Sequence, residues 1–276
     1  MSSQLQCLIF DVDGTLANTE RDGHRVAFNL AFAEAGLNWQ WSVEFYGQLL
    51  AVSGGKERLR YFLRRHLPQF QPNCELSEFV AYLHQLKTNH YLNLLRSGAI
   101  SLRPGAKRLI EEARAANLTL AIATTSSLPN VIALLEKYLD LDWFEVIAAG
   151  DIVPAKKPAP DIYHYVVKRL ALPLDSFVVI EDSDNGLEAA IAAGLTTVVT
   201  VNNYTERQDF SRAALVISDL GEPEQPCRVI QGHLPSATGY LNLASLRGII
   251  GRQVIIPNPQ SPISSPPNKK ARRLKS

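Results

Sequence analysis

The sequence has few of the residues that mark extracellular, membrane or nucleic-acid-binding proteins. Its three cysteines, Cys7, Cys74 and Cys227, lie far apart, show no metal-ligand spacing and leave one thiol unpaired in any disulfide scheme. No apolar run is long enough for a transmembrane helix. The 28 basic and 27 acidic residues give a net charge of +1, which provides no overall field for nucleic acid or a membrane surface. These absences favour a cytoplasmic protein without a nucleic-acid or membrane partner.

What the sequence does have is a regular alternation of strand and helix patterns. Short apolar runs without polar alternation are typical of strands buried on both faces. They lie at residues 7–10, 118–123, 146–149, 177–180 and 196–201. Helical patterns between them span residues 106–117, 128–139, 161–172 and 185–193. We therefore predict an α/β fold, a Rossmann-like parallel sheet with helices on both faces.

One long segment interrupts this alternation. Residues 20–98 carry several helical patterns and no convincing strand, which predicts an α-helical cap domain inserted after the first strand. The expected organisation is a first core segment at residues 1–19, the cap at 20–98, and a second core segment with a C-terminal extension at 99–250. Residues 251–276 are rich in proline and polar residues, a composition that predicts a disordered tail.

The first predicted strand ends in two carboxylates. Asp11 and Asp13 follow it two residues apart, and Gly14 allows the chain to turn sharply away. Ligands of open parallel sheets bind at the carboxyl ends of the strands. The alternative is an ordinary turn rich in Asp and Gly between a strand and a helix.

Polar residues of complementary type follow three other predicted strands. They are Thr124 and Thr125, Lys157, and the pair Glu181 and Asp182. Each has an ordinary alternative: a hydroxyl or an aspartate can cap the next helix, and a lysine can lie in a solvated loop. Together they supply what phosphoryl transfer requires, namely a carboxylate nucleophile, further acidic oxygens, a hydroxyl and a cation.

Charge neutralisation is compulsory at such a site. A carboxylate repels a phosphate dianion by about 4 kcal/mol per pair of unit charges at 4 Å, for an effective dielectric constant near 20. Carboxylate oxygens of Asp11 and Asp182, with the main-chain carbonyl of Asp13, suit Mg²⁺, which prefers oxygen ligands in octahedral geometry. Lys157 would add a second positive charge.

The motifs FDVDGT, IATT, KKPAPDIY and VVIEDSDNG occur in the order typical of the haloacid dehalogenase superfamily, which the first 220 residues resemble. The resemblance implies that Asp11 forms an aspartyl-phosphate and that Asp13 acts as general acid and base. It further implies a phosphate-binding group of Thr124, Thr125 and Lys157. The metal site would comprise Asp11, Asp13, Glu181 and Asp182. Lys157, which precedes the Pro-Ala-Pro run, matches the family lysine better than Lys156.

The predicted cap is similar to that of the beta-phosphoglucomutase branch. The runs NTERDGHRVAFNLAFAEAGL and VSGGKERL resemble CbbY-like xylulose-1,5-bisphosphate phosphatases. This resemblance assigns Glu20, Gly55 and Lys56 to substrate recognition. Without it, Glu20 would be read as an exposed acid in a first helical turn, and the glycine-rich run as a turn with solvated charges. His24 shows no metal-ligand pattern and is expected to have a structural role.

These observations predict a monomeric, magnesium-dependent phosphomonoester hydrolase that acts on a small phosphorylated molecule, xylulose-1,5-bisphosphate being favoured. A beta-phosphoglucomutase-like sugar phosphomutase would use the same motifs. A non-catalytic module that binds a phosphorylated ligand is the alternative of another class, although the complete set of motif residues counts against it. A dehalogenase is disfavoured because Asp13 and the acidic pair Glu181–Asp182 are what magnesium phosphatases require.

Overall fold

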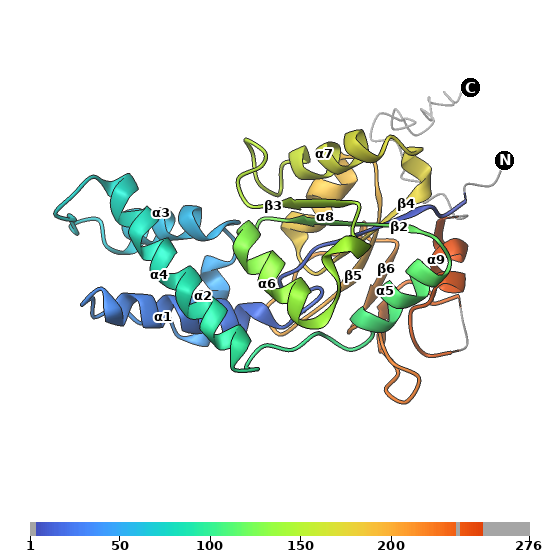
Figure 1. Cartoon of the computed structure of the whole chain (residues 1–276), viewed down its shortest axis with the longest axis horizontal. Coiled ribbons are helices and arrows are strands. Elements are labelled where there is room, and N and C mark those ends of the chain that lie inside the picture. The colour runs from blue at the N-terminus through green and yellow to red at the C-terminus, as the bar shows by residue number, and fades with distance from the viewer. Residues whose placement is uncertain (1–3, 236–237, 251–276) are drawn as a thin grey trace, which may run out of the picture.

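The computed structural model describes residues 4–235 and 238–250, which form a sheet-based core and a helical cap (Figure 1). The core is built on a seven-stranded sheet of order β3-β2-β1-β4-β5-β6-β7. Its strands are β1 (Cys7–Phe10), β2 (Thr119–Thr124), β3 (Val146–Ala149), β4 (Phe177–Glu181), β5 (Thr196–Thr200), β6 (Leu215–Ile217) and β7 (Val229–Gln231). Neighbours from β3 to β6 pair in parallel, and β7 is antiparallel to β6. The predicted α/β class is confirmed.

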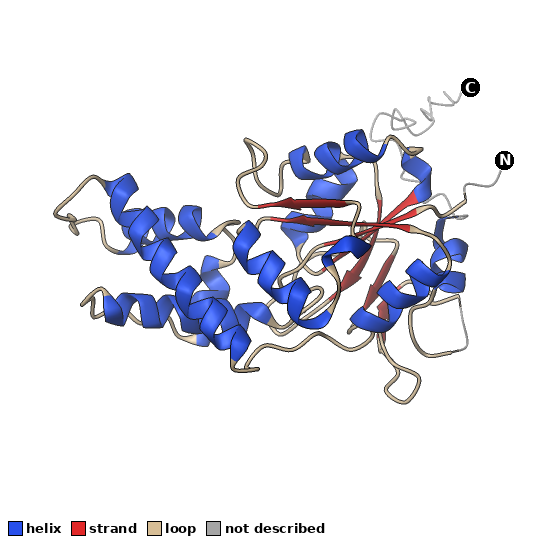
Figure 2. Ribbon diagram, viewed as in Figure 1, coloured by secondary structure: helices blue, strands red, loops and turns tan. Residues whose placement is uncertain are grey.

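Helices cover both faces of the sheet (Figure 2). On one face α5 (Ala106–Ala115), α6 (Leu128–Tyr138) and α9 (Leu243–Ile250) contribute to one large apolar cluster. On the other face α7 (Asp161–Leu170) and α8 (Asp184–Ala192) pack against residues of the opposite strand faces. Burial on both faces explains why the central strands lack polar alternation.

Helical elements between β1 and α5 form the cap. It consists of η1 (Glu20–His24), a π-helical turn, and of α1 (Arg25–Glu34), α2 (Val43–Leu49), α3 (Gly55–His66) and α4 (Leu76–Arg96). The cap has an apolar cluster of its own, in which Phe28, Phe32, Trp41 and Phe62 pack ring against ring. This apolar cluster is separate from those of the sheet, and the domain limits at residues 20 and 98 stay a prediction.

Two features differ from the expectations. β6 and β7 were not predicted, because β6 has only three residues and β7 is exposed along its whole length. The first of the helical patterns expected in residues 20–98 begins as the π-helical turn η1 and continues as α1. The predicted tail at 251–276 lies outside the described residues. No helix in the described part of the chain has the length and apolar character needed to cross a membrane.

Candidate active site

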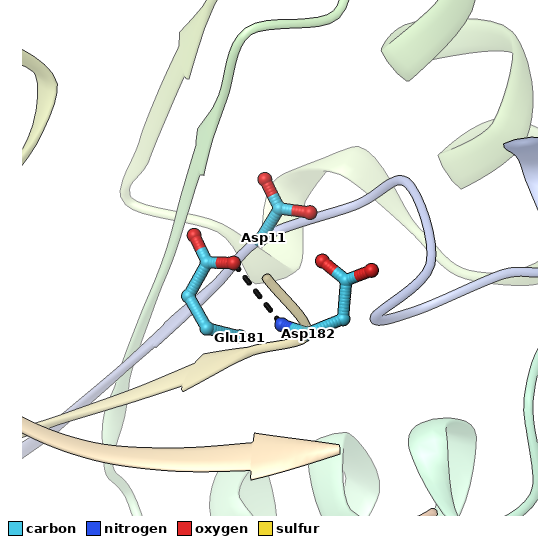
Figure 3. A group of neighbouring side chains, drawn as sticks. All are labelled: Asp11, Glu181 and Asp182. Atoms are coloured by element: carbon cyan, nitrogen blue, oxygen red, sulfur yellow. Dashed lines mark hydrogen bonds between the residues drawn. The ribbon is translucent and has the colours of Figure 1, made fainter. Parts of the chain in front are cut away.

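Three carboxylates meet at the carboxyl ends of two neighbouring strands (Figure 3). Phe10 of β1 is aligned with Ile180 of β4, so Asp11 and Glu181, the next residues, come to the same level of the sheet. Oxygens of Asp11, Glu181 and Asp182 lie within 4.8 Å of one another, and all three residues are buried. The fold therefore brings these three residues, all named from the sequence, into one group.

Lys157 is the cation of this group. Its Nζ donates to Asp11 Oδ1 at 2.7 Å, to Glu181 Oε1 at 2.5 Å and to the main-chain oxygen of Ala123 at 2.8 Å. The side chain comes from the loop after β3 and is 5% exposed. Burial lowers the pKa of Lys157, but the carboxylates of Asp11 and Glu181 outweigh that effect, so the pKa lies above its usual value. Lys157 is therefore charged.

Glu181 is held on both oxygens. Tyr163 Oη also donates to Oε1 at 2.6 Å, and the main-chain N–H of Asp182 donates to Oε2 at 3.1 Å. With Lys157 on Oε1 as well, the carboxylate is fixed in orientation. Glu181 in turn helps to fix the position of Lys157 Nζ.

The negative charge of the group exceeds what Lys157 can balance. Burial raises the pKa of Asp11 to about 8, even though Lys157 opposes the rise. Burial, with the neighbouring charges of Asp11 and Glu181, also raises the pKa of Asp182. Asp182 Oδ2 accepts a hydrogen bond of 2.6 Å from Asn202 Nδ2. Three hard oxygen donors with uncompensated charge are a set that fits a divalent cation.

Asp13 lies in a different environment. Its Oδ1 accepts hydrogen bonds from Thr19 Oγ1 at 2.6 Å and pairs with His24 Nε2 at 2.9 Å. The His24 ring stacks on Tyr91, with centroids 4.4 Å apart. Burial raises the pKa of Asp13, but His24 and the hydrogen bond from Thr19 outweigh it and hold the pKa well below its usual range. The two carboxylates of the first motif thus have opposite surroundings.

Three of the four expected metal ligands lie in one group, and the side chain of Asp13 lies outside it. The described acidic cluster contains Asp11, Glu181 and Asp182, whereas the side chain of Asp13 is engaged by Thr19 and His24. The sequence assigned the main-chain carbonyl of Asp13 to the metal, and that assignment stays a prediction. Thr124 Oγ1 accepts from the main-chain N–H of Ser126 at 3.2 Å, within the turn that follows β2.

A cleft of about 510 Å³ lies between the cap and the core. Asp13 and Thr125 line it from the core side, and Glu20, Gly55 and Lys56 line it from the cap. A smaller cavity of about 70 Å³ is lined by Asp11, Thr124, Thr125, Lys157 and Asp182. The two share Asp13, Glu20, Arg58 and Thr125, so the acidic group adjoins the larger cleft. Every site residue named from the sequence lies at one of these two cavities or in the acidic group beside them.

Cationic side chains from both parts face the cleft. Lys56 Nζ lies 2.7 Å from Asp151 Oδ2, and Lys156 Nζ lies 3.0 Å from Oδ1 of the same carboxylate. Lys87 is 4% exposed, and its Nζ lies 5.4 Å from the ring centroids of both Phe28 and Tyr91. Burial lowers the pKa of Lys87 to about 8. The cleft is thus suited to an anion larger than a single phosphoryl group.

Glu20 is held in place by two cap residues. Tyr46 Oη donates to Glu20 Oε2 at 2.5 Å, and Arg58 donates to Tyr46 Oη at 2.9 Å. The guanidinium of Arg58 also lies 4.0 Å from Glu20 Oε2. Glu20 is therefore an oriented acceptor at the cleft and not a freely solvated acid. Its role in substrate recognition stays a prediction.

Comparisons with known proteins agree with this geometry. The model of the haloacid dehalogenase-like hydrolase family matches residues 5–194. The chain belongs to this family. It is 46% identical over 247 residues to the plasmid-encoded protein CbbY of Cupriavidus necator, a match that covers 88% of this chain and 96% of that protein. This membership makes the chain a hydrolase, and its relatives support a phosphatase.

Solved structures extend the comparison within the family. CbbY from Rhodobacter sphaeroides in complex with xylulose-(1,5)bisphosphate has 43% identity and a TM-score of 0.74, over 80% of this chain and 96% of that one. A beta-phosphoglucomutase described as putative, from Thermotoga maritima, has 26% identity and a TM-score of 0.55, over 74% of this chain and 89% of that one. The resemblance to both branches is confirmed.

Several residues of the site were not found from the sequence. His24 was given only a structural role, yet it contacts Asp13, and Thr19 was not singled out. Tyr163, on α7, donates a hydrogen bond to Glu181. Asn202, in the loop after β5, donates one to Asp182. Thr19 and His24 lie within 11 residues of Asp13. A helix predicted directly after the motif could therefore have indicated that they fold back onto Asp13. Nothing local to Asn202 could have pointed to Asp182.

Proposed function

We propose that the chain is a magnesium-dependent phosphatase that forms an aspartyl-phosphate at Asp11 and hydrolyses a small sugar phosphate, with xylulose-1,5-bisphosphate as the preferred substrate. One observation carries the proposal: Asp11 is ion-paired with Lys157 inside an acidic group, while Asp13 is held separately at the adjoining cleft. The CbbY structure with bound xylulose-(1,5)bisphosphate supports the choice of substrate.

The chemistry has two steps. In the first, a carboxylate oxygen of Asp11 attacks phosphorus, the bond from phosphorus to the ester oxygen breaks, and Asp13 gives that oxygen a proton. In the second, Asp13 takes a proton from water, the water oxygen attacks the phosphoryl group, and Asp11 is released together with inorganic phosphate. The low pKa of Asp13 keeps its carboxylate ionised in the free protein, which is the form that accepts a proton in the second step. An approaching phosphate dianion raises that pKa and favours the acid form.

Residues around Asp11 hold the phosphoryl group. Lys157 balances charge on the phosphoryl oxygens, and the hydroxyls of Thr124 and Thr125, which line the small cavity, donate to them. Asp11 and Asp182, with the main-chain carbonyl of Asp13, would hold Mg²⁺, which would supply Lewis-acid stabilisation of the phosphoryl oxygens. Glu181 contributes charge and holds Lys157 in line.

Inorganic phosphate release tests the proposal. A panel of sugar mono- and bisphosphates is assayed with Mg²⁺ and with excess chelator. The proposal predicts release that requires Mg²⁺ and is fastest with the ketose bisphosphate. Conversion of a sugar phosphate to its isomer without phosphate release would instead indicate a phosphomutase. Binding of the ligand without turnover would indicate a non-catalytic module.

We further propose that Lys56 grips the second phosphate of the substrate. In the structure its ammonium, with that of Lys156, is paired with Asp151, a carboxylate that a phosphate dianion can replace. Lys56→Ala is expected to reduce kcat/KM on the bisphosphate about 10- to 100-fold, the scale of a charge-assisted contact of about 1.5–3 kcal/mol. A small aryl phosphate, which does not reach Lys56, is expected to be hydrolysed at the native rate.

Two control variants separate binding from structure. Lys107→Ala removes an exposed lysine whose partner is Glu111, 3.8 Å away, and is expected to leave both substrates unaffected. Asp151→Asn removes the carboxylate that Lys56 holds. It is expected to leave or improve the KM for the bisphosphate. Equal losses in Lys56→Ala and Asp151→Asn would show that Lys56 acts only by pairing with Asp151.

A further inference from the structure

A loop of the core reaches into the cap. Residues 201–205 follow β5, and the ring of Tyr204 packs against the apolar cluster of the cap. Its centroid lies 6.1 Å from that of Tyr46, in an edge-on arrangement. Tyr46 in turn donates to Glu20 at the substrate cleft. Tyr204 therefore belongs to the sheet-based core but contacts the cap, and Tyr46 is the side chain between it and Glu20 at the cleft.

The cap provides room for this ring. A methyl group placed on Gly47, within α2, would lie 2.9 Å from Tyr204 Cδ1. Glycine inside a helix costs about 1 kcal/mol relative to alanine, so a helical glycine calls for a packing reason. Tyr204 Oη is buried without a hydrogen-bond partner. The ring and not the hydroxyl is thus the part that fits the cap.

The same loop holds a carboxylate of the acidic group. Asn202 Nδ2 donates to Asp182 Oδ2 at 2.6 Å, and Asn202 Oδ1 accepts from the main-chain N–H of Tyr204 at 2.9 Å. The loop is closed by Thr205, whose Oγ1 accepts from the N–H of Asn202 at 2.9 Å. One amide side chain therefore joins the residue that touches the cap to a carboxylate that the proposed function assigns to the metal.

We propose that this loop couples the position of the cap to the orientation of Asp182, and that Tyr204 is the positioning residue on which the cap docks. When Tyr204 is seated against Gly47, Asn202 is fixed and so is Asp182 Oδ2. Coupling between two sites is reciprocal. A cation bound at Asp182 therefore stabilises the docked cap, and a docked cap strengthens cation binding. The cation half of this inference rests on the proposed function, and the docking half does not.

Hydrogen–deuterium exchange of the full chain tests both halves. In the free protein, Tyr204→Ala is expected to speed the exchange of α2 amides relative to the native chain. Tyr204→Phe, which keeps the ring, is the matched control and is expected to behave as the native protein. Gly47→Ala crowds the ring while improving the helix, and it is also expected to speed exchange in residues 201–205.

Added Mg²⁺ tests the coupling. In the native chain and in Tyr204→Phe, Mg²⁺ alone is expected to slow exchange in α2 about fivefold or more, the usual lower range of coupling between sites. In Tyr204→Ala this protection is lost, and the Mg²⁺ dissociation constant measured by calorimetry rises by the same factor. The same Mg²⁺-induced protection in Tyr204→Ala as in the native chain would overturn the coupling.

The docking part and the cation part of the inference would fail with different results. If Mg²⁺ does not bind the native chain, the proposed metal site is wrong, while faster α2 exchange in metal-free Tyr204→Ala still establishes the docking contact. If α2 exchange is the same in metal-free Tyr204→Ala and Tyr204→Phe, the docking role of Tyr204 is overturned. If Tyr204→Ala does not fold, Gly47→Ala is compared with Tyr204→Phe for exchange in residues 201–205, and equal exchange there would overturn the docking role of Tyr204.

Discussion

Two carboxylates two residues apart have opposite environments. Asp11 is buried beside Lys157 and other acids, and burial raises its pKa to about 8. Asp13 has His24 and Thr19, which hold its pKa below the usual range. The sequence could place both at the end of the first strand. It could not show that their side chains diverge, because that depends on η1, a π-helical turn that brings His24 back to Asp13.

Asp13→Asn tests the division of roles. The amide keeps the shape and the contact with Thr19 but cannot transfer a proton, so kcat is expected to fall about 10²- to 10⁴-fold. The measurement is steady-state phosphate release. Asp22→Asn, the same change at an exposed acid of the same turn, serves as the control and should leave kcat near the native value. Activity of Asp13→Asn within a few-fold of native would rule out proton transfer by Asp13.

Lys87 gives the site an expected pH dependence. Burial lowers its pKa to about 8, so the ammonium is charged below that pH and neutral above it. Its attraction for an anionic substrate is therefore present at pH 7 and lost as the pH rises through 8. The value of kcat/KM for the bisphosphate should fall above about pH 8, in a profile that reports groups of the free enzyme.

Lys87→Met tests whether Lys87 causes the fall in kcat/KM above about pH 8. Methionine has a similar length and no charge, so kcat/KM should be lower at pH 7 and the decline above pH 8 should disappear. The pKa of Asp11 is also raised to about 8. Its titration has the opposite effect on kcat/KM, which rises with pH because the carboxylate must be ionised to attack phosphorus. An unchanged decline in Lys87→Met would assign the alkaline limb to another group.

At the scale of elements, burial decides what the sequence reveals. β1 and β4 are buried at every position, and each was predicted to within one residue. β7 is exposed at every position and, among the described strands, pairs with β6 alone, so its sequence carries no pattern of a buried strand. Its place at the sheet edge follows from the chain around it and could not be read from its own three residues.

The end of α7 offers a test of local backbone strain. Ala171 follows α7 with φ at 52°, in the left-handed region, where a residue with a side chain is disfavoured by about 1–2 kcal/mol. It is exposed, so glycine would lose little packing. Ala171→Gly is expected to raise the free energy of unfolding by about 0.5–1 kcal/mol, measured by urea denaturation.

The matched control is the same substitution in an ordinary helical conformation. Ala115 is exposed in the last turn of α5. Ala115→Gly should lower the free energy of unfolding by about 0.5–1 kcal/mol. If both variants are destabilised, the strain at Ala171 is not relieved by glycine, and the interpretation of that helix end is wrong.

For the whole molecule, the sequence could predict five strands of the sheet, the helical character of the segment after the first strand, and the four strand ends that supply site residues. Those features depend on short local patterns and on the rule that parallel strands share an edge. Contacts between cap and core could not be predicted. Lys56 with Asp151, and Tyr204 with Gly47, join residues about a hundred or more positions apart, and they exist only once both parts have folded and met.

The central claim is that a phosphoryl group passes through Asp11. The direct test is to quench the protein in acid during turnover of a sugar phosphate with Mg²⁺, digest it and analyse the peptides by mass spectrometry. The account predicts one phosphoryl group on the carboxylate of Asp11, and none in Asp11→Asn or when Mg²⁺ is chelated. A phosphoryl group on another residue, or rapid turnover by pure Asp11→Asn, would contradict it.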